Sequence, residues 1–290
     1  MSDPRIWYHG RILDAREVGV GPLAPVLHYG LGVFEGIRAY GTPAGPAIFR
    51  LEEHMERMAR GAAALGLDFD PAECARGCRE VLADSGLQDA YIRPLTFFAL
   101  GNLTLDMDGH TSRTLVAAIP WRNHLGDAAR EGIRAHVSPM RRNAAPAIPP
   151  LKLCGGYVNS VLAKREASRA GFQEAIFQDD RGFVVEATGE NVFLVKGGKV
   201  VAVEHPNALP GITRATIIEL AGAEARPARV EELLDADEVF LTGTSGEVAP
   251  LCALDRRTWR PGPVGRELAA RYDDLVHGRV PERKSWLTVV

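Results

Sequence analysis

The chain of 290 residues is 46% hydrophobic and 24% charged, which is typical of a globular protein long enough to bury a sizeable core. Its net charge of −3 argues against nucleic acid or an anionic membrane as the main partner, because both favour basic surfaces. The sequence shows no secretory signal and no apolar run of the ~20 residues that a membrane helix needs. Cys74 and Cys78 are expected in the core, so we expect a cytoplasmic protein without a metal site.

Helical and strand periods alternate along the chain, which predicts an α/β or α+β fold. Helices are expected over 51–65 and 71–83. Asp70 is placed to cap the second helix, and Gly86 lies just beyond its end.

Strands are predicted over 90–100 and 114–119, and Pro94 within the first indicates an edge position or a bulge. The pattern then breaks, which indicates a connector between two domains. We therefore expect a small N-terminal domain over 1–119, an interdomain loop over 120–132 and a larger C-terminal domain over 133–290.

In the second half, Gly197 and Gly198 separate two apolar runs and predict a two-residue hairpin turn. The other elements expected there are a strand over 133–137, a helix over 155–170, strands over 174–178, 183–186 and 191–195, a helix over 213–221 and a strand over 238–242.

Only five of the 34 basic residues are lysines, so chemistry that needs an amine has few candidates. A catalytic lysine must lose its proton, which apolar surroundings promote. Lys196 and Lys199 flank the glycine turn, Lys284 lies in a charged C-terminal stretch, and Lys164 is expected on the polar face of a helix. Lys152 alone lies in an apolar run, although a surface lysine at a loop end is an equally simple interpretation.

Two turns are suited to binding an anion. Leu209 to Arg214 places Gly211 and Thr213 at the start of a helix, where backbone N–H groups and the helix dipole favour phosphate. Gly243 to Glu247 forms a second turn of small residues after a strand. The sequence lacks a Walker A loop, an HExxH zinc site and a GxSxG elbow, which disfavours phosphoryl transfer and serine hydrolysis.

Taken in order, several segments resemble the class IV, or fold-type IV, aminotransferases that use pyridoxal 5′-phosphate, and most closely the branched-chain amino acid aminotransferases. The resemblance implies a small N-terminal α/β domain and a larger, cofactor-binding pseudo-barrel domain. The segments are His28–Arg38, Glu53–Arg57, Tyr91–Pro94, Lys152–Tyr157, Glu186–Phe193, Leu209–Arg214 and Gly243–Glu247.

The resemblance implies that Lys152 forms the internal aldimine with the cofactor and then shuttles a proton. Glu186 is implied as the acid that keeps the pyridine nitrogen protonated. The other implied cofactor contacts are Tyr157 at the phenolic oxygen, Leu209 at the ring face, and Arg57, Gly211, Ile212, Thr213 and Thr244 around the phosphate, with Glu190 in a supporting role.

On the substrate side, the resemblance implies that Arg93 receives the second carboxylate of glutamate or 2-oxoglutarate. It also implies a homodimer or larger oligomer, in which Tyr29 and the loop near Leu103 reach the neighbouring subunit's site. The remaining implied substrate residues are Tyr91, Ser245 and Gly246 at the α-carboxylate, and Phe34, Gly36, Arg38, Trp121, Tyr29 and Tyr157 around the apolar side chain; plain core packing remains an alternative for the aromatic residues.

Two departures from the family pattern concern the substrate pocket. The loop Gly101–Asp106 replaces a Gly-x-Gly-Val-Asn-Pro-like sequence, and His124 stands where some members carry a pocket tyrosine. Both leave the identity of the amino donor open, because small differences in an apolar pocket discriminate weakly.

The implied reaction is a ping-pong transamination, through a pyridoxamine intermediate, from a branched-chain L-amino acid to 2-oxoglutarate. Within the family, a transaminase for D-amino acids or (R)-amines and an aminodeoxychorismate-lyase-like enzyme remain alternatives. A catalytically silent binding protein on the same scaffold is disfavoured by the joint presence of Lys152, Glu186 and Arg57.

Overall fold

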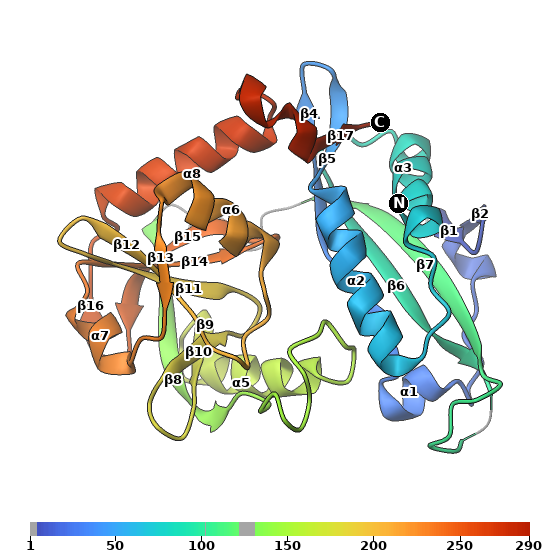
Figure 1. The fold of residues 1–290 in the computed structure, drawn as a ribbon, viewed down its shortest axis with the longest axis horizontal. Coiled ribbons are helices and arrows are strands. Elements are labelled where there is room, and N and C mark those ends of the chain that lie inside the picture. Colours follow the sequence, from blue (N-terminus) through green and yellow to red (C-terminus); the bar gives the residue numbers. More distant parts are fainter. Residues whose placement is uncertain (1–4, 102, 122–130) are drawn as a thin grey trace. The chain divides into compact units, whose positions relative to one another are not determined.

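The computed structural model describes residues 5–101, 103–121 and 131–290, which form two compact units (Figure 1). Unit 1 combines Met1–Arg122 with Leu151–Gly156 and Leu275–Val290. Unit 2 combines Asn123–Pro150 with Tyr157–Asp274. The units thus differ from the expected division at residue 133, because two short segments of the second half belong to unit 1.

Unit 1 is built on an eight-stranded antiparallel sheet in the order β17-β5-β4-β6-β7-β1-β2, with β3 also paired to β6. The C-terminal segment joins unit 1 because β17 pairs with β5. The strands are β1 (Arg5–Tyr8), β2 (Arg11–Asp14), β3 (Gly32–Phe34), β4 (Ile37–Thr42), β5 (Gly45–Phe49), β6 (Ala90–Leu100), β7 (Thr111–Pro120) and β17 (Leu287–Val289).

The helices α2 (Leu51–Leu65) and α3 (Pro71–Ser85) confirm the two predicted helices, with α3 two residues longer than expected. Asp70 accepts hydrogen bonds from the first-turn amides of α3, and Gly86 ends it in the left-handed region, as predicted. Both helices bury an apolar face in the core of unit 1, where Cys74 and Cys78 lie fully buried. The shorter helices are η1 (Ala15–Glu17), α1 (Pro25–Tyr29) and η2 (Pro281–Trp286).

Strand β6 has the predicted bounds, but the predicted edge position for Pro94 is wrong. β6 pairs with β7 along one side, and with β4 and then β3 along the other. Pro94 lies between the part of β6 that pairs with β4 and the part that pairs with β3. Its carbonyl accepts a hydrogen bond from Glu35 N at 3.0 Å. Because the ladder is already interrupted there, the missing N–H of proline leaves no hydrogen bond unmade.

The segment Leu151–Gly156 belongs to unit 1 because it hydrogen-bonds along β3. Phe34 N donates to Lys152 O at 3.2 Å, and Cys154 N donates to Gly32 O at 2.8 Å. Helix α2 packs closely on the same strand, since a Cβ at Gly61 would lie only 2.6 Å from a methyl group of Val33. Strand β3 is therefore in contact with both the lysine segment and helix α2.

Unit 2 contains a curled nine-stranded sheet in the order β10-β9-β8-β15-β14-β11-β12-β13, with β16 paired to β15. β8 is parallel to β9 and β15, and β12 is parallel to β13; the other pairs are antiparallel. The strands are β8 (Ile133–Arg141), β9 (Glu174–Gln178), β10 (Val184–Ala187), β11 (Asn191–Lys196), β12 (Lys199–Val203), β13 (Glu224–Arg226), β14 (Glu238–Gly243), β15 (Glu247–Leu254) and β16 (Arg257–Thr258).

The mixed helices and strands confirm the predicted fold class. The predicted hairpin is also confirmed, because Lys196 pairs with Lys199 across Gly197 and Gly198, both at positive φ. Among the described residues, no helix is long and apolar enough to span a membrane. The remaining helices are α5 (Tyr157–Arg169), α6 (Ile212–Ala221), α7 (Val230–Asp235) and α8 (Pro263–Val276).

Candidate active site

In unit 1, Lys152 lies beside an aromatic ring on the edge of β3. Its Nζ is 5.1 Å from the centre of the Phe34 ring, and the Arg93 guanidinium carbon is 4.9 Å from the same centre. The structure therefore brings together Lys152, Phe34 and Arg93, which the sequence places far apart. An amine and a guanidinium beside one apolar ring are suited to hold an anionic group next to an apolar chain.

The other substrate candidates of unit 1 are connected to Arg93 by a series of side-chain contacts. Arg93 Nη2 donates to the Tyr91 hydroxyl at 2.9 Å, and the Tyr91 ring stacks on Trp121 with 5.5 Å between ring centres. The Arg38 guanidinium is buried, with its Cζ 4.2 Å from the Tyr40 ring and 4.6 Å from the Trp121 ring. All of these side chains belong to β4, β6 and the residue that follows β7.

Gly36 lies in the connection between β3 and β4, directly under Tyr91. A Cβ at this position would lie 2.0 Å from the Tyr91 hydroxyl oxygen. Any larger residue at this position would therefore displace Tyr91.

Arg57 belongs to a fully buried cluster with two residues that were not among the predicted site residues. Its Nε donates to Glu35 Oε1 at 2.7 Å and its Nη2 to Glu35 Oε2 at 2.8 Å. His54 Nδ1 lies 2.8 Å from Glu35 Oε2. A guanidinium carries five N–H groups, and this fork uses two of them to fix its plane.

The charges of this cluster determine its protonation. Burial alone raises the pKa of Glu35, but the Arg57 guanidinium and His54 outweigh burial and hold this pKa far below its usual range. Burial lowers the pKa of His54, Glu35 opposes this, and Arg57 and Lys152 lower it further. At neutral pH the cluster thus combines an ionised Glu35, a charged Arg57 and a neutral His54, close enough to Lys152 to feel its charge.

The loop candidates of unit 1 lie at the surface. Tyr29 is 40% exposed and its hydroxyl donates to Leu103 O at 3.1 Å, which brings α1 together with the β6–β7 connection. Residue Asn102 of the Gly101–Asp106 loop and His124 lie outside the described residues.

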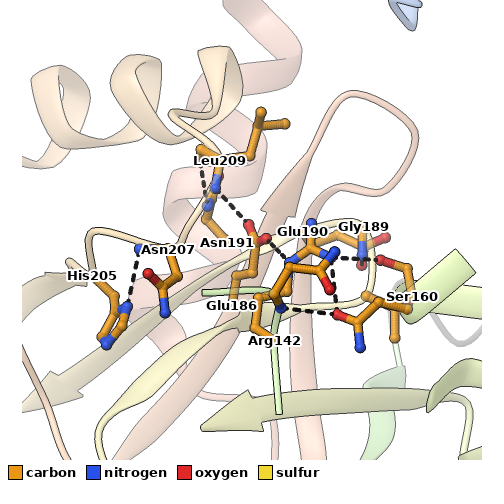
Figure 2. Close-up of polar contacts among 12 residues, drawn as sticks. Arg142, Ser160, Glu186, Gly189, Glu190, Asn191, His205, Asn207 and Leu209 are labelled. Atoms are coloured by element: carbon orange, nitrogen blue, oxygen red, sulfur yellow. Dashed lines mark hydrogen bonds and ion pairs between the residues drawn. The ribbon is translucent and has the colours of Figure 1, made fainter. Parts of the chain in front are cut away.

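In unit 2, Glu186 is buried and held from two sides (Figure 2). Arg142 Nε donates to Glu186 Oε1 at 2.7 Å, and the backbone N of Leu209 donates to Glu186 Oε2 at 3.0 Å. Arg142 in turn donates to Asn159 Oδ1 at 3.2 Å. A carboxylate with a guanidinium and an amide donor is stabilised in its ionised form.

The loop before α6 is fixed by Asn191. Its Nδ2 donates to Leu209 O at 2.9 Å (Figure 2), and a Cβ at Gly211 would lie 2.0 Å from its Oδ1. Gly211 is the N-cap of α6 and provides no side-chain cap for the first amides, while Ile212 and Thr213 are buried in the first turn. This end of α6 keeps the features of an anion-binding helix start.

The second small-residue turn joins β14 to β15 through Thr244, Ser245 and Gly246. Glu247 follows with φ 54°, in the left-handed region that non-glycine residues rarely adopt. Before the turn, Thr242 Oγ1 is buried and has no hydrogen-bond partner among the described residues. The left-handed conformation of Glu247 costs about 1–3 kcal/mol, and such a conformation is maintained only where the surroundings impose it.

The last candidates of unit 2 are Tyr157, the first residue of α5, and Glu190 in the turn between β10 and β11. The prediction that Lys164 lies on a polar helix face is only partly right. Its Nζ reaches inward to the buried carboxylate of Glu174 at 2.6 Å. The remaining lysines, Lys196, Lys199 and Lys284, are exposed as predicted.

Sequence reasoning missed Glu35, His54, Arg142 and Asn191. Glu35 does carry a signal, because it is the only charged residue in the run from Gly30 to Ile37. His54 and Arg57 lie three residues apart on α2 and so face the same side. Arg142 carries no such signal in the sequence, because it follows another arginine in a polar stretch. Among the described residues, no group of His, Cys, Asp and Glu side chains is arranged to hold a metal ion.

Solved structures with the same fold were found by comparison. The branched-chain aminotransferase of Thermoproteus uzoniensis with norvaline is 37% identical with a TM-score of 0.93, covering 98% of each chain. The branched-chain amino acid aminotransferase of Thermobaculum terrenum, in its pyridoxal-phosphate form, is 31% identical with a TM-score of 0.91, covering 99% of each chain. The fold is therefore that of the fold-type IV pyridoxal-phosphate enzymes.

Sequence comparison agrees over the whole chain. The branched-chain-amino-acid aminotransferase of Pseudomonas aeruginosa is 37% identical over 301 residues, covering 99% of this chain and 98% of that protein. The sequence model described as amino-transferase class IV matches residues 32–254, and the chain belongs to this family. It is accordingly a pyridoxal-phosphate-dependent aminotransferase, as the resemblance implied.

Replacing Glu35 by Gln is expected to lower the free energy of unfolding of the cofactor-free protein by about 3–5 kcal/mol, because the buried Arg57 loses this carboxylate. The folded-state pKa of Glu35 is depressed, so its stabilising contribution is present above the ordinary value of 4.5 and declines as the pH falls below it. Denaturant unfolding at several pH values will therefore show the gap to wild type narrowing below about pH 4.5.

Glu53→Gln is the matched control for this variant. Glu53 lies on the same helix and pairs with Arg50, but its side chain is 37% exposed, so the loss should be about 1 kcal/mol or less. Equal stability of Glu35→Gln and wild type at neutral pH would show that the buried pair does not hold the cluster together.

Proposed function

We propose that this enzyme transfers the amino group of a branched-chain L-amino acid to 2-oxoglutarate. The observation that carries the proposal is the arrangement around Phe34, where the amine of Lys152 and the guanidinium of Arg93 lie beside one apolar ring. The amine supplies the chemistry, the ring accommodates an apolar side chain, and the guanidinium suits a carboxylate. The full-length similarity to branched-chain aminotransferases supports the same substrate class.

The residues present fit pyridoxal 5′-phosphate. The uncapped start of α6, where a Cβ at Gly211 would collide with Asn191, is suited to its phosphate, and the buried Glu186 carboxylate to a pyridinium nitrogen. Bound there, the cofactor supplies an aldehyde that captures amines and an aromatic ring that accepts electrons from the substrate α-carbon.

In unit 1, we assign Lys152 Nζ to holding the cofactor and to moving the proton at the substrate α-carbon. The Phe34 ring beside Nζ gives the amine an apolar neighbour on which the side chain of a substrate can also pack. Arg57 is assigned to the cofactor phosphate, with Glu35 fixing the plane of its guanidinium.

In unit 2, we assign Glu186 to the pyridine nitrogen. Arg142 and the Leu209 amide keep this carboxylate ionised and hold both of its oxygens in place. An ionised carboxylate keeps the pyridine nitrogen protonated, which increases the capacity of the ring to accept electrons. For the cofactor we further propose Ile212, Thr213 and Thr244 at the phosphate, Tyr157 at the phenolic oxygen and Leu209 at the ring face. For the substrate α-carboxylate we propose Tyr91, Ser245 and Gly246.

The proposed donor selectivity depends on how Tyr91 is held. Gly36 leaves the space that the Tyr91 hydroxyl occupies, and Trp121 stacks on the Tyr91 ring. These rings, with Phe34 and the buried Arg38 packed behind Trp121, form an apolar surface suited to a branched aliphatic chain. D-Amino acids, (R)-amines and lyase chemistry remain the competing possibilities within the family.

We also propose that the enzyme is a homodimer, or a higher oligomer built on it. An apolar surface patch, defined here as Leu23, Leu27, Tyr29, Leu103 and Leu105, lies on α1, the segment just before it and the β6–β7 connection, with exposures from 40% for Tyr29 to 84% for Leu105. The hydrogen bond from Tyr29 to Leu103 O joins its two parts. An exposed cluster of this kind favours burial against a second copy of the chain.

The test of the proposed activity is a donor panel with 2-oxoglutarate as acceptor. L-Leucine, L-valine and L-isoleucine should react, and a D-amino acid or an (R)-arylamine should be at least about 100-fold slower, a loss of roughly 2.7 kcal/mol of transition-state stabilisation. Lys152→Ala should retain the fold and lose activity by about 10²–10⁴-fold or more, because the proton transfer loses its base.

Borohydride reduction of the cofactor-loaded enzyme, followed by peptide mapping, identifies the lysine that carries the cofactor. The expected adduct is on Lys152, and Lys199→Ala, at an exposed lysine, is the matched control with normal activity. An adduct on another lysine would refute the assignment, and strong (R)-arylamine turnover without leucine activity would refute the donor class.

Arg93→Gln should raise the KM for 2-oxoglutarate by about 10–100-fold, because a charge-assisted hydrogen bond to the second carboxylate is lost. The half-reaction with L-leucine, which has no second carboxylate, should change by less than about threefold and is the internal control. Single-turnover kinetics of the two half-reactions measure both values. Equal losses in the two half-reactions would instead show that Arg93 acts only through Tyr91, whose hydroxyl accepts its hydrogen bond.

Leu27→Asp combined with Leu105→Asp should convert the wild-type oligomer to monomers, because two charges would have to be buried at the interface. Sedimentation velocity measures the mass of each form. Ile148→Asp, at an exposed apolar residue of unit 2, is the control and should leave the mass unchanged. A wild-type monomer, or an unchanged oligomer in the double variant, would refute this interface.

A further inference from the structure

The segment between β12 and α6 carries the backbone amide that holds Glu186. Leu209 N donates to one oxygen of this carboxylate at 3.0 Å (Figure 2). Asn207 ties the segment to the chain that follows β8, because its Oδ1 accepts from Ala145 N at 2.8 Å. A further anchor lies where the segment leaves β12, at His205, a residue that the sequence did not indicate as part of the site.

His205 begins a β-turn and closes it twice. Ala208 N donates to His205 O at 3.0 Å, and Pro206 occupies the second position of the turn, which its fixed φ suits. The imidazole adds a second contact, since Asn207 N donates to its Nδ1 at 3.1 Å (Figure 2). Asn and Asp side chains ordinarily close a turn in this way, by accepting from the amide two residues further on. Here an imidazole takes that place.

The contacts of the imidazole determine its tautomer. A backbone N–H can only donate, so Nδ1 is an acceptor and carries no proton. Nε2 then carries the ring proton and faces Asp179 Oδ2 at 3.5 Å. The other oxygen of Asp179 accepts from Arg181 N at 2.8 Å and from Phe183 N at 2.9 Å, which fixes the carboxylate. The His205 side chain, only 7% exposed, is thus held as a neutral ring between a backbone amide and a carboxylate.

We propose that His205 is a positioning residue for the loop that binds the cofactor, and that its neutral ring closes the turn on which this loop depends. Through Asn207 it fixes the approach to Leu209, whose amide holds Glu186, and to Gly211, the N-cap of α6. A loosened turn lets both features move, so the cofactor is held less tightly. This role rests on the proposed function for the placement of the cofactor beside Glu186 and the start of α6.

A mildly acidic pH should release this anchor. A second proton on the ring would occupy Nδ1, and the Asn207 amide would lose its acceptor. Asp179 can accept from Nε2 in either state, so the ring can gain this proton and keep its carboxylate partner. Among charged side chains, only imidazole ordinarily changes its charge between about pH 5 and pH 8. The charged side chains placed around the turn are Asp179, Asp180 and Arg181 on the β9–β10 connection, Glu204 before it, Arg214 of α6 and Arg226 of β13.

Three substitutions distinguish the two nitrogens of the ring. His205→Asn places an amide oxygen where Nδ1 accepts, and this oxygen does not gain a proton. His205→Gln extends towards the position of Nε2 instead, and His205→Ala has neither group. At about pH 8 the Kd for pyridoxal 5′-phosphate, measured by equilibrium dialysis, should rise about five- to tenfold in the Gln and Ala variants, which lose one hydrogen bond. The Asn variant should stay within about twofold of wild type, because the contact is restored.

The same binding measurement, repeated down to about pH 5.5, tests the neutral ring. The wild-type Kd should rise about five- to tenfold more than that of His205→Asn, because only the imidazole loses its acceptor on protonation. Other groups titrate in both proteins, so the difference between the two curves isolates His205. His9→Asn makes the same exchange at an exposed histidine of unit 1 and should follow the wild-type profile.

Hydrogen exchange of the cofactor-free protein, measured by mass spectrometry, follows the turn without any ligand. Amides in the peptide over 204–211 should exchange faster in His205→Ala and His205→Gln than in wild type, because the turn opens more often. His205→Asn should exchange like wild type.

The outcomes separate the turn from the proposed function. An Asn variant that binds the cofactor as weakly as the Ala variant, or parallel pH profiles of wild type and His205→Asn, would overturn the role of the ring. Unchanged exchange over 204–211 in every variant would also overturn it and leave the proposed function standing. Faster exchange in His205→Ala with unchanged cofactor affinity would instead refute the proposed placement of the cofactor. The pH comparison needs only wild type and His205→Asn, so it decides the matter even if His205→Ala does not fold.

Discussion

The buried pairing of Glu35 with Arg57 is the contact on which the part of unit 1 around Lys152 depends. Glu35 comes from the connection between β3 and β4, and Arg57 and His54 come from α2, so one carboxylate ties a helix to the sheet edge. Burying a guanidinium costs several kcal/mol unless a partner of good geometry offsets it. The bidentate fork supplies that geometry and fixes the plane of the guanidinium, while the Lys152 segment is hydrogen-bonded to the same β3.

Unit 2 places two carboxyl groups of one strand-turn-strand, those of Glu186 and Glu190, in different surroundings. Glu186 receives Arg142 and a backbone amide, which stabilise its negative charge. Burial and the negative charge of Glu174 raise the pKa of Glu190. The two residues stand four apart in one strand-turn-strand, so their difference arises from neighbours contributed by distant segments.

Local patterns predicted much of the fold because they depend on neighbours in the sequence. The apolar stripe of α2, the Asp70 cap and the Gly197–Gly198 turn all follow from spacing and backbone preference. The edge position predicted for Pro94 was wrong because the gap in its hydrogen-bond ladder is formed by β3 and β4, some sixty residues earlier in the chain. Arg142 was unpredictable for a similar reason: β8 brings it to Glu186, while its neighbour Arg141 extends to the exposed Asp180.

The lysines show how far elimination by sequence context reaches. Exposure was predicted correctly where it depends on a turn or a charged tail, as at Lys196, Lys199 and Lys284. The prediction from sequence context fails for Lys164. A position on a helix determines which face carries the side chain, but it does not determine where the end of a four-carbon chain lies. Lys164 extends to Glu174, so its amine contacts a buried carboxylate at 2.6 Å. Lys152 instead lies against an aromatic ring, with its Nζ 5.1 Å from the centre of Phe34. Two lysines twelve residues apart therefore have different partners, a buried carboxylate at the start of β9 for Lys164 and an aromatic ring of β3 for Lys152, and these partners come from strands that the local sequence does not reveal.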